Sequence, residues 1–265
     1  MTDGIVIQAR SGSSRMPAKI LLPFDGGQTI LDIILGKIKR DNPGLPVIVA
    51  TTTNPADDRI ADMAASHNVE CFRGSEPDVL SRFTGAADLF GLDRVIRVCS
   101  DNPFMQTDTF RDLINAADRN PDADYVAFAF PDGRPTIKSH LGLYAELATA
   151  DALRRIEAMA AEPEGSDNAV MPETERKMCR EHVTIGLYTH PADFSLAFLP
   201  LPEELQERTD LRLTLDTPSD FKLLQELYRR LGTETDGSLD ALLEMVDANP
   251  QYGKIMKQNI AQNEK

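Results

Sequence analysis

A short polar loop near the start of the chain combines the residue types that bind phosphate groups. It spans residues 10–19, directly after the apolar run Ile5-Val6-Ile7, and contains one glycine, three serines and three cations. Glycine and serine allow successive backbone N–H groups to form an anion-binding nest, while Arg10, Arg15 and Lys19 add full positive charges. A triphosphate needs both, because its charge must be neutralised in a partly desolvated place. We predict that the loop binds phosphates; a solvated turn is the alternative.

The loop is not a Walker A motif, because Ala18 precedes Lys19 and Ile20 follows it, so that GxxxxGK[ST] is absent. Charge nevertheless favours a small anionic ligand. Residues 1–40 hold six cations against three anions, a local charge of +3, on a chain whose net charge is −14. The acidic chain lacks the basic surface that long nucleic acids require, so we expect no nucleic acid polymer as a partner. Uneven surface charge without a ligand is the alternative.

Two aspartates stand where predicted strands end. Asp101 lies in Ser-Asp-Asn-Pro after the strand expected at 94–99, and Asp216 lies in Thr-Leu-Asp-Thr-Pro after one expected at 211–215. Two carboxylates at strand ends can together hold Mg²⁺, which prefers oxygen ligands and keeps several waters. Each could instead be a turn or cap residue, Asp216 at the start of the helix expected over 218–231. With the cationic loop, the metal interpretation is favoured.

Histidines and a second pair of aspartates are weaker candidates. His140 follows Lys138 and Ser139, and His182 follows Arg180 and Glu181; a lone histidine is more often structural or solvated than catalytic. His67 and His190 carry little functional weight. Asp122-Ala123-Asp124 fits the DxD pattern of metal-dependent glycosyltransferases, but it precedes a predicted strand. We interpret it as a solvated turn on the opposite rim of the sheet.

Strands and helices alternate through the first half of the chain. Apolar runs predict strands, and amphipathic stretches between them predict helices, so the pattern is that of a mainly parallel sheet with helices on both faces. Ligands of such sheets bind beyond the carboxyl ends of the strands. We therefore expect the loops that follow these strands to converge on one rim: 10–19, 51–54, 73–76 and 100–103.

The regular alternation of predicted strands and helices ends after residue 131. Strands are predicted over 141–147, 194–199 and 211–215, and helices over 149–161, 218–231 and 239–247. The polar residues 162–177, with two prolines and a glycine, predict an exposed loop. The polar stretch 254–265 predicts a fraying end.

Composition bounds the class of protein. The chain has 265 residues, 42% of them hydrophobic, and no apolar run of the roughly 18 residues that cross a bilayer. It has no basic-then-apolar start typical of a signal peptide. Cys71, Cys99 and Cys179 are odd in number and lack CxxC spacing, so a disulfide framework or zinc site is not expected. We predict a cytoplasmic protein without a membrane partner.

The phosphate loop also carries a resemblance. Residues 7–19, Ile-Gln-Ala-Arg-Ser-Gly-Ser-Ser-Arg-Met-Pro-Ala-Lys, resemble the signature loop of sugar-acid cytidylyltransferases, which make CMP-activated sialic acids and CMP-KDO. The subgroup that it resembles most is that of the SpsF-like cytidylyltransferases of spore coat polysaccharide biosynthesis. Further similar segments occur in the same order over nearly the whole chain: 72–75, 100–103, 180–184 and 215–221.

The resemblance implies a fold and a set of roles. The fold would be an α/β, Rossmann-like nucleotidyltransferase fold, usually a homodimer, with a small protruding element that helps to form the neighbour's site. Arg10 and Lys19 match positions that grip the triphosphate, with Arg15 a third, and Asp101 and Asp216 match magnesium ligands. The cytosine would be read by Arg73 and Ser75. Two departures are Asn102, where the family often has an acidic residue or cysteine, and the segment 131–184, which fits the sialate and KDO enzymes poorly.

Together these observations predict a single domain over residues 1–265, with 131–210 as an acceptor-binding and dimerisation insertion. The predicted activity is Mg²⁺-dependent transfer of CMP from CTP to an acidic 2-keto sugar, with release of pyrophosphate, for surface polysaccharide biosynthesis. Catalytic residues would be Arg10, Lys19 and Asp101. The nucleotide-binding set is Gln8, Ala9, Arg10, Ser11, Gly12, Ser13, Arg15, Lys19, Arg73 and Ser75; the acceptor-binding set is His140, Arg180 and His182. The alternatives are a glycosyltransferase that uses a nucleotide-sugar, and a nucleotide-binding protein without catalysis.

Overall fold

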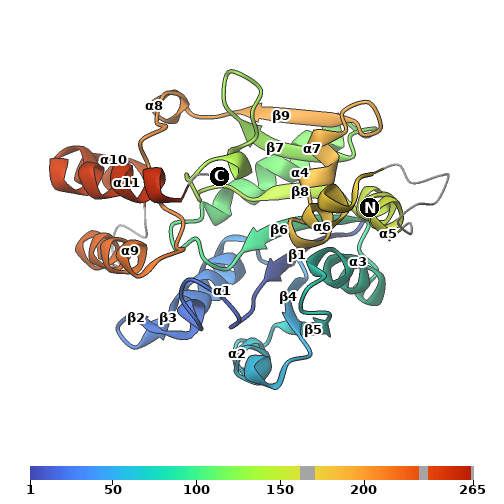
Figure 1. The fold of residues 1–265 in the computed structure, drawn as a ribbon, viewed down its shortest axis with the longest axis horizontal. Coiled ribbons are helices and arrows are strands. Elements are labelled where there is room, and N and C mark those ends of the chain that lie inside the picture. Colours follow the sequence, from blue (N-terminus) through green and yellow to red (C-terminus); the bar gives the residue numbers. More distant parts are fainter. Residues whose placement is uncertain (162–170, 233–237, 264–265) are drawn as a thin grey trace.

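A seven-stranded sheet forms the centre of the computed structural model, which describes residues 1–161, 171–232 and 238–263 (Figure 1). The strand order is β5-β4-β1-β6-β8-β7-β9, and every neighbouring pair is parallel except the two that involve β8. The strands are β1 (Asp3–Gln8), β4 (Val47–Thr52), β5 (Glu70–Gly74), β6 (Arg94–Cys99), β7 (Tyr125–Ala129), β8 (Glu146–Thr149) and β9 (Leu196–Pro200). A small hairpin pairs β2 (Pro23–Asp25) with β3 (Gln28–Thr29).

Helices cover both faces of this sheet, as the sequence predicts. Alternate residues of β1 show why: Ile5 and Ile7 enter one apolar cluster, and Val6 enters the other. The first cluster packs against α1 (Ile30–Asp41), α2 (Asp58–Ser66) and α4 (Phe110–Arg119), and it extends to α9 (Pro218–Leu231), α10 (Leu239–Asp247) and α11 (Pro250–Gln262). The second packs against α3 (Val79–Phe90), α5 (Ala150–Ala161), α6 (Glu173–Glu181) and α7 (Ile185–Thr189).

Short helical turns make up most of the remaining regular structure. They are α8 (Glu203–Gln206) and the 3₁₀ turns η1 (Lys19–Leu21), η2 (Pro55–Asp57), η3 (Thr107–Thr109) and η4 (Thr136–Lys138). Within the described ranges, no helix has the length and apolar character needed to cross a bilayer.

Capping boxes fix the start of two helices that border the site. Thr29 caps α1, and its hydroxyl exchanges hydrogen bonds with Asp32. Thr217 caps α9 in the same way with Asp220, and Pro218 occupies the first helical position, where its missing N–H costs nothing. The helix start at Thr217 therefore fixes the backbone immediately after Asp216.

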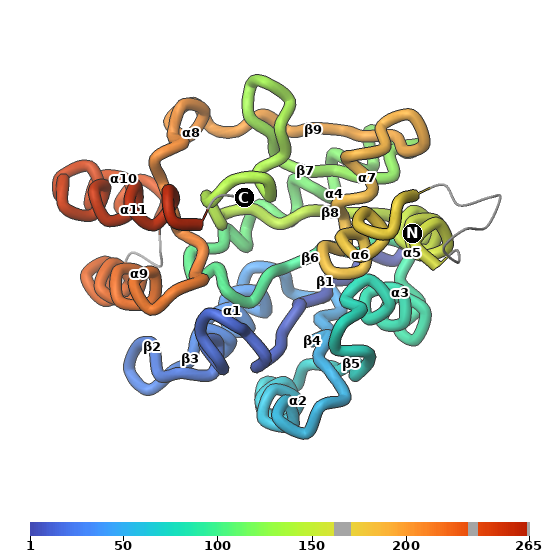
Figure 2. The backbone as a smooth tube through the Cα atoms, viewed as in Figure 1, coloured from blue at the N-terminus to red at the C-terminus, as the bar shows by residue number. Residues whose placement is uncertain are grey.

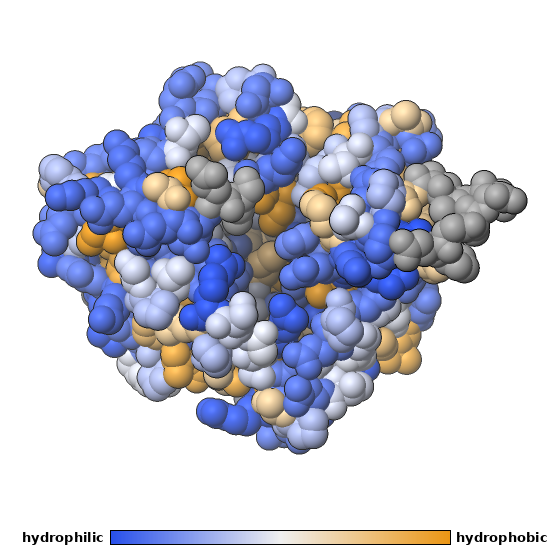
Figure 3. Space-filling view, in the orientation of Figure 1, coloured by the Kyte–Doolittle hydropathy of each residue, from blue (hydrophilic) through white to orange (hydrophobic). Residues whose placement is uncertain are grey.

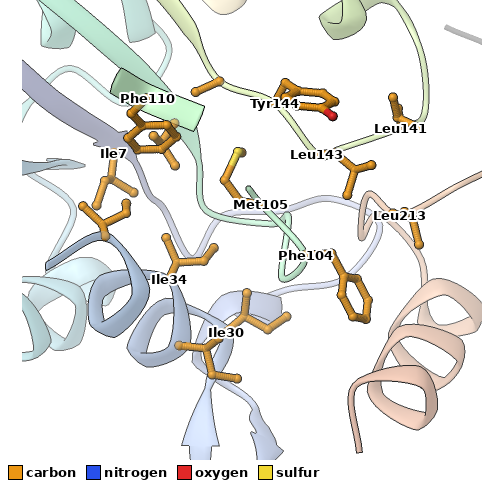
Figure 4. Packing of buried hydrophobic residues seen from close by; sticks show 14 of the residues in the cluster. Ile7, Ile30, Ile34, Phe104, Met105, Phe110, Leu141, Leu143, Tyr144 and Leu213 are labelled. Atoms are coloured by element: carbon orange, nitrogen blue, oxygen red, sulfur yellow. The ribbon is translucent and has the colours of Figure 1, made fainter. Parts of the chain in front are cut away.

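Two predicted strands differ from the structure. Only Glu146–Thr149 pairs in the sheet, and residues 141–145 form an irregular segment that lies before β8. Residues 211–215 are extended but join no strand; Leu213 N donates to His140 O at 2.9 Å, and Leu215 N donates to Asp101 O at 3.0 Å. Figure 4 shows Leu141, Leu143 and Leu213 in the core around these loops. Their apolar alternation reflects packing between loops, which sequence periodicity cannot distinguish from a strand.

The two regions predicted to be irregular contain helices. Residues 173–177 belong to α6, where Arg176 and Cys179 are buried, so the loop prediction is wrong there; residues 162–170 lie outside the described residues. The predicted fraying of 254–265 is also wrong for 254–262, because α11 buries Tyr252, Met256 and Asn259 on one face. Figure 2 shows α11 running toward the segment that follows β7.

Candidate functional site

The loops that follow the parallel strands meet at one rim, as predicted. Ser11 N and Ser11 Oγ donate to Asp57 Oδ1 at 2.7 and 2.5 Å, which ties the 10–19 loop to η2. Asn54 Nδ2 donates to Glu76 Oε2 at 3.0 Å, which ties the loop after β4 to the loop after β5. Lys19 Nζ lies 2.7 Å from Asp101 Oδ2 and so adds the loop after β6.

Lys19 stands at the centre of the site. Its ammonium also lies 3.5 Å from Asp216 Oδ1 and donates to Leu215 O. The preceding Ala18 has φ +53°, a left-handed conformation that turns the chain inward so that the Lys19 side chain is only 11% exposed. Burial opposes the positive charge, but the Asp101 and Asp216 carboxylates outweigh it and raise the pKa of Lys19. Lys19 therefore remains a cation between two carboxylates.

This geometry fits a magnesium ion held partly by substrate. Two carboxylates from different loops, Asp101 and Asp216, converge on a single positive charge. In the part of the chain that the structure describes, no three His, Cys, Asp or Glu side chains group into an all-protein metal site. Mg²⁺ is commonly bound by one or two carboxylates together with waters and substrate phosphates. The donor set fits that mode and would not fit a structural zinc.

A buried arginine, Arg212, which the sequence analysis did not select, donates a hydrogen bond to Asp216 from the protein interior. Arg212 is 1% exposed and donates to Asp216 Oδ2 at 3.1 Å and to both oxygens of Asp220 at 2.8 and 2.9 Å. Burial opposes ionisation of Asp220, but the hydrogen bonds and charge of Arg212 outweigh it and lower the pKa of that carboxyl. Asn259 of α11 donates to Asp220 at 2.8 Å. Local sequence gives no signal for the buried arginine, because Arg212 and Thr214 alternate with leucines and so take positions typical of the exposed face of a strand.

Hydrogen bonds within the 10–19 loop and to its neighbours fix the shape of this loop. Ser13 N and Ala18 N both donate to Ser11 O at 2.8 Å, which curls the loop. A side chain at Gly12 would bring its Cβ to 2.6 Å from Glu76 Oε1, so the glycine permits this close approach. Arg15 is half exposed and donates to Asp216 Oδ1 at 3.0 Å and to Asn263 Oδ1 at 3.1 Å.

A second arginine missed by the sequence analysis supports the loop after β5. Arg82 is fully buried on α3 and donates from Nη1 to the carbonyl oxygens of Ser75 and Glu76. Its Nε and Nη2 have no partner among the described residues. Burial, and next the positive charge of Arg10, lower the pKa of Arg82 to about 10. Positive charge thus accumulates behind the phosphate loop.

Three residues of the predicted nucleotide set use their side chains to shape loops. Gln8 Oε1 accepts from Arg97 Nη2 at 3.2 Å, within a buried network that also contains the Arg97–Glu146 ion pair. Arg73 donates to the carbonyls of Thr52 and Asn54 at 2.8 and 2.9 Å. Ser75 Oγ accepts from Asp78 N at 3.3 Å, and Ala9 is buried and donates its N–H to Ala50 O at 3.2 Å.

The predicted acceptor residues do not lie together. His140 contacts Arg212 beneath Asp216, its Nδ1 lying 2.5 Å from Nη1. Arg180 is on α6, where it donates to Ala160 O at 2.6 Å and lies 4.0 Å from Asp78 Oδ2. His182 is exposed at the C-terminal cap of the same helix. His140 is thus the predicted acceptor residue that contacts Arg212, which in turn donates to Asp216 and Asp220.

The DxD motif is a turn at the start of β7. Asp122 is exposed, and Asp124 lies 2.8 Å from Arg155 and accepts from Ser195 N at 2.9 Å. Both precede the strand, so they lie at the rim opposite Asp101. The predicted turn is confirmed, and the geometry gives no support to a DxD metal site.

The match to known proteins agrees with this geometry. The sequence model of the family described as "Cytidylyltransferase" matches residues 5–246. The chain belongs to the cytidylyltransferase family. It is therefore a nucleotidyltransferase, as the sequence analysis predicts, and the expected resemblance to this family is confirmed.

Two related sequences align with almost the whole of this cytidylyltransferase. An uncharacterized protein of Methanocaldococcus jannaschii is 34% identical over 94% of this chain and 92% of its own length. The spore coat polysaccharide biosynthesis protein SpsF of Bacillus subtilis is 29% identical over 92% of this chain and 94% of its own. Among solved structures, a cytidylyltransferase from Leptospira borgpetersenii is 27% identical, with a TM-score of 0.78 over 95% of this chain and 96% of the other.

A more distant structure shares the fold. CMP:2-keto-3-deoxy-manno-octonic acid synthetase, solved in complex with CTP, has a TM-score of 0.61 at 16% identity, over 87% of this chain and 99% of the other. The predicted Rossmann-like nucleotidyltransferase fold is thereby confirmed.

Proposed function

We propose that this cytidylyltransferase transfers CMP from CTP to an acidic 2-keto sugar, with Mg²⁺ as cofactor and pyrophosphate as the other product. The observation that carries the proposal is the convergence of Lys19 on Asp101 and Asp216 beside the cationic 10–19 loop. The cationic side chains there would bind the phosphates of a nucleoside triphosphate, and the two carboxylates would bind its metal ion. We further propose that the enzyme is a cytoplasmic homodimer without a nucleic acid or membrane partner, in which residues 131–210 contribute to acceptor binding and dimerisation.

The proposed reaction is an in-line displacement at the α-phosphorus of CTP. A sugar hydroxyl oxygen forms the new O–P bond, loses its proton to solvent, and the bond to the β-phosphate oxygen breaks. Arg10, Arg15 and Lys19 neutralise charge that builds on the leaving pyrophosphate, which lowers the barrier without a covalent intermediate. Asp101 and Asp216 would hold Mg²⁺, which would supply further charge neutralisation when bound.

Two related proteins support the choice of acceptor. SpsF of B. subtilis is named for spore coat polysaccharide biosynthesis, and the structurally similar synthetase acts on 2-keto-3-deoxy-manno-octonic acid. We therefore propose that the product serves surface polysaccharide biosynthesis.

A pyrophosphate-release screen tests the function. CTP, UTP, GTP and ATP are each combined with a panel of 2-keto sugar acids, with Mg²⁺ or with EDTA. We expect pyrophosphate with CTP and Mg²⁺, and a fall in turnover on the order of 100-fold for Asp101→Asn. The matched control is Asp122→Asn, an exposed aspartate of the opposite rim, which should retain wild-type activity.

Each alternative function predicts a different outcome of this screen. Wild-type turnover of Asp101→Asn would refute the assigned metal ligand. Loss of activity in Asp122→Asn, with sugar transfer from a nucleotide-sugar, would favour a glycosyltransferase. Binding of CTP without pyrophosphate release for any acidic sugar would identify a nucleotide-binding protein without catalysis.

A further inference from the structure

The C-terminal helix α11 lies outside the span of the family match and still reaches the candidate site. The family model ends at residue 246, and α11 begins at Pro250. The face of the molecule in Figure 3 is mainly hydrophilic and is hollowed near its centre, and α11 runs toward that centre in the same orientation (Figure 1). Membership of the family therefore says nothing about the role of this helix.

The buried face of α11 changes from apolar to polar along the helix. Tyr252 and Met256 are 6% and 0% exposed and belong to the apolar core. Asn259, which is 5% exposed, follows at the next turn, and Asn263 stands four residues later at the C-terminal cap. Residues three or four apart share one face of a helix. A buried amide costs free energy unless its polar atoms find partners, so an asparagine in this row indicates a specific hydrogen bond.

The partner of Asn259 is the carboxylate that holds Asp216. Asn259 Nδ2 donates to Asp220 Oδ1 at 2.8 Å, and Asp220 Oδ2 accepts from Asp216 N at 3.1 Å. Arg212, which donates to both oxygens of Asp220, also donates to Asp216 Oδ2 at 3.1 Å. Asp220 therefore holds Asp216 twice, directly by its backbone and through Arg212 by its side chain. The hydrogen bond from Asn259 fixes the orientation of the Asp220 carboxylate on which both contacts depend.

Asn263 reaches the same aspartate from the solvent side. Its Oδ1 accepts from Arg15 Nη1 at 3.1 Å, and Arg15 Nη2 donates to Asp216 Oδ1 at 3.0 Å. Asn263 Nδ2 donates to Asn259 O at 2.9 Å, so the two asparagines are linked along the helix. The Arg15 side chain is 54% exposed, and a long exposed cation has many rotamers, which this contact restricts.

We propose that α11 is part of the reaction centre and that its Asn259 is a positioning residue for Asp216, acting through Asp220. Asn263 holds Arg15 on the same carboxylate. The inference rests on the proposed function, because it takes Asp216 as a carboxylate that would hold Mg²⁺. Groups that orient a metal ligand from behind are needed for metal affinity, and their loss typically costs about 10- to 100-fold in affinity or activity.

Two substitutions remove the hydrogen bond from Asn259 in different ways. Asn259→Leu keeps the branched outline of the side chain but cannot donate, and Asn259→Asp keeps the shape but presents a second carboxylate to Asp220. The matched control is Met256→Ala, which weakens the apolar packing of the same face one turn earlier. Circular dichroism verifies that each variant is folded at the temperature of the assays.

The dissociation constant of CTP is measured by calorimetry for each protein, once with Mg²⁺ and once with EDTA. Pyrophosphate release is measured with the acceptor that is active with the wild-type enzyme. Mg²⁺ should tighten CTP binding to the wild type. In both Asn259 variants this Mg²⁺ effect should fall about tenfold and turnover about 10- to 100-fold, while CTP binding in EDTA changes little. Met256→Ala should have a lower Tm but the Mg²⁺ effect and turnover of the wild type.

An undiminished Mg²⁺ effect in Asn259→Leu would overturn the inference while the proposed function stands. An equal loss in Met256→Ala would also overturn it, because α11 would then act through the stability of the fold alone. If the wild-type enzyme releases no pyrophosphate with any sugar acid, the proposed acceptor is wrong, and the binding measurements still decide the role of Asn259. A wild-type enzyme that binds CTP equally with Mg²⁺ and with EDTA would overturn both.

Discussion

Replacing Asp57 by asparagine should loosen the phosphate loop where it begins. Asp57 is 1% exposed; its Oδ1 accepts from Ser11 N and Ser11 Oγ, and its Oδ2 accepts from Thr52 Oγ1. An asparagine has only one accepting oxygen. Its amide NH₂ group would therefore face the donor of at least one of these hydrogen bonds, and that hydrogen bond would be lost. Asp57 is not among the site residues that the sequence predicts.

The size of this effect follows from the hydrogen bonds that asparagine cannot accept. Hydrogen bonds to a charged group contribute about 1.5–3 kcal/mol each, so Asp57→Asn should lower the free energy of unfolding by at least that amount. For a chain of this length, 1 kcal/mol shifts Tm by about 2–4 °C, which gives a fall of about 3–12 °C. The adjacent Asp58 offers a matched control: it is 59% exposed in its ion pair with Arg73, so Asp58→Asn should cost no more than about 1 kcal/mol.

The effect should depend on pH in one direction. Burial opposes ionisation of Asp57, but the hydrogen bonds from Ser11 and Thr52 outweigh it and lower the pKa of the carboxyl. A carboxyl whose pKa is lower in the folded than in the unfolded state stabilises the protein above its unfolded pKa of about 3.9, and this contribution is lost as pH falls through the folded pKa. The difference between wild type and Asp57→Asn should therefore be constant from about pH 5 to 8 and shrink below about pH 4.

Urea unfolding followed by circular dichroism at about pH 7 and about pH 3 measures this difference. Equal stability of wild type and Asp57→Asn at neutral pH, or a difference that is unchanged at acidic pH, would refute the reasoning. The phosphate loop should also lose its preorganisation, which predicts a KM for CTP raised about tenfold at temperatures where the variant is folded.

Two further substitutions address the centre of the site. Lys19→Met should lower turnover on the order of 100-fold in the pyrophosphate assay, and the unscreened repulsion between Asp101 and Asp216 should make Mg²⁺ raise Tm more in this variant than in wild type; an equal Mg²⁺ shift would contradict the assigned geometry. Gly142→Ala should destabilise by about 1–3 kcal/mol, because Gly142 has φ +62° and an added Cβ would lie 3.0 Å from the backbone N of Thr214; unchanged urea unfolding would show that the segment adjusts without strain.

Much of the nucleotide half of the site could be predicted from local sequence. The apolar run of β1 predicts a buried strand, and the Gly/Ser loop with cations that follows it predicts a phosphate-binding loop. The strand ends of a parallel sheet meet at one rim. Asp101 can be selected for that reason. Asp216 can be selected although 211–215 is no strand, because an extended apolar segment delivers its last residue to the same place through the Leu215 to Asp101 hydrogen bond.

The supporting charges could not be predicted in this way. Sequence patterns treat an arginine or aspartate as exposed unless a partner is known, and Arg212 and Asp220 are buried because they satisfy each other. These contacts join an irregular segment to the first turn of α9, and local periodicity carries no information about them.

The antiparallel strand β8 has a consequence for how this enzyme could change its substrate. β7 ends at the rim of the site, and β8 begins there and runs back, so both ends of segment 130–145 are anchored on the same rim. Such a segment can vary in length and composition without altering the order of the sheet or the phosphate loop. If this segment contributes to acceptor binding, as proposed for 131–210, exchanging 130–145 between relatives should change the acceptor and leave the nucleotide site intact.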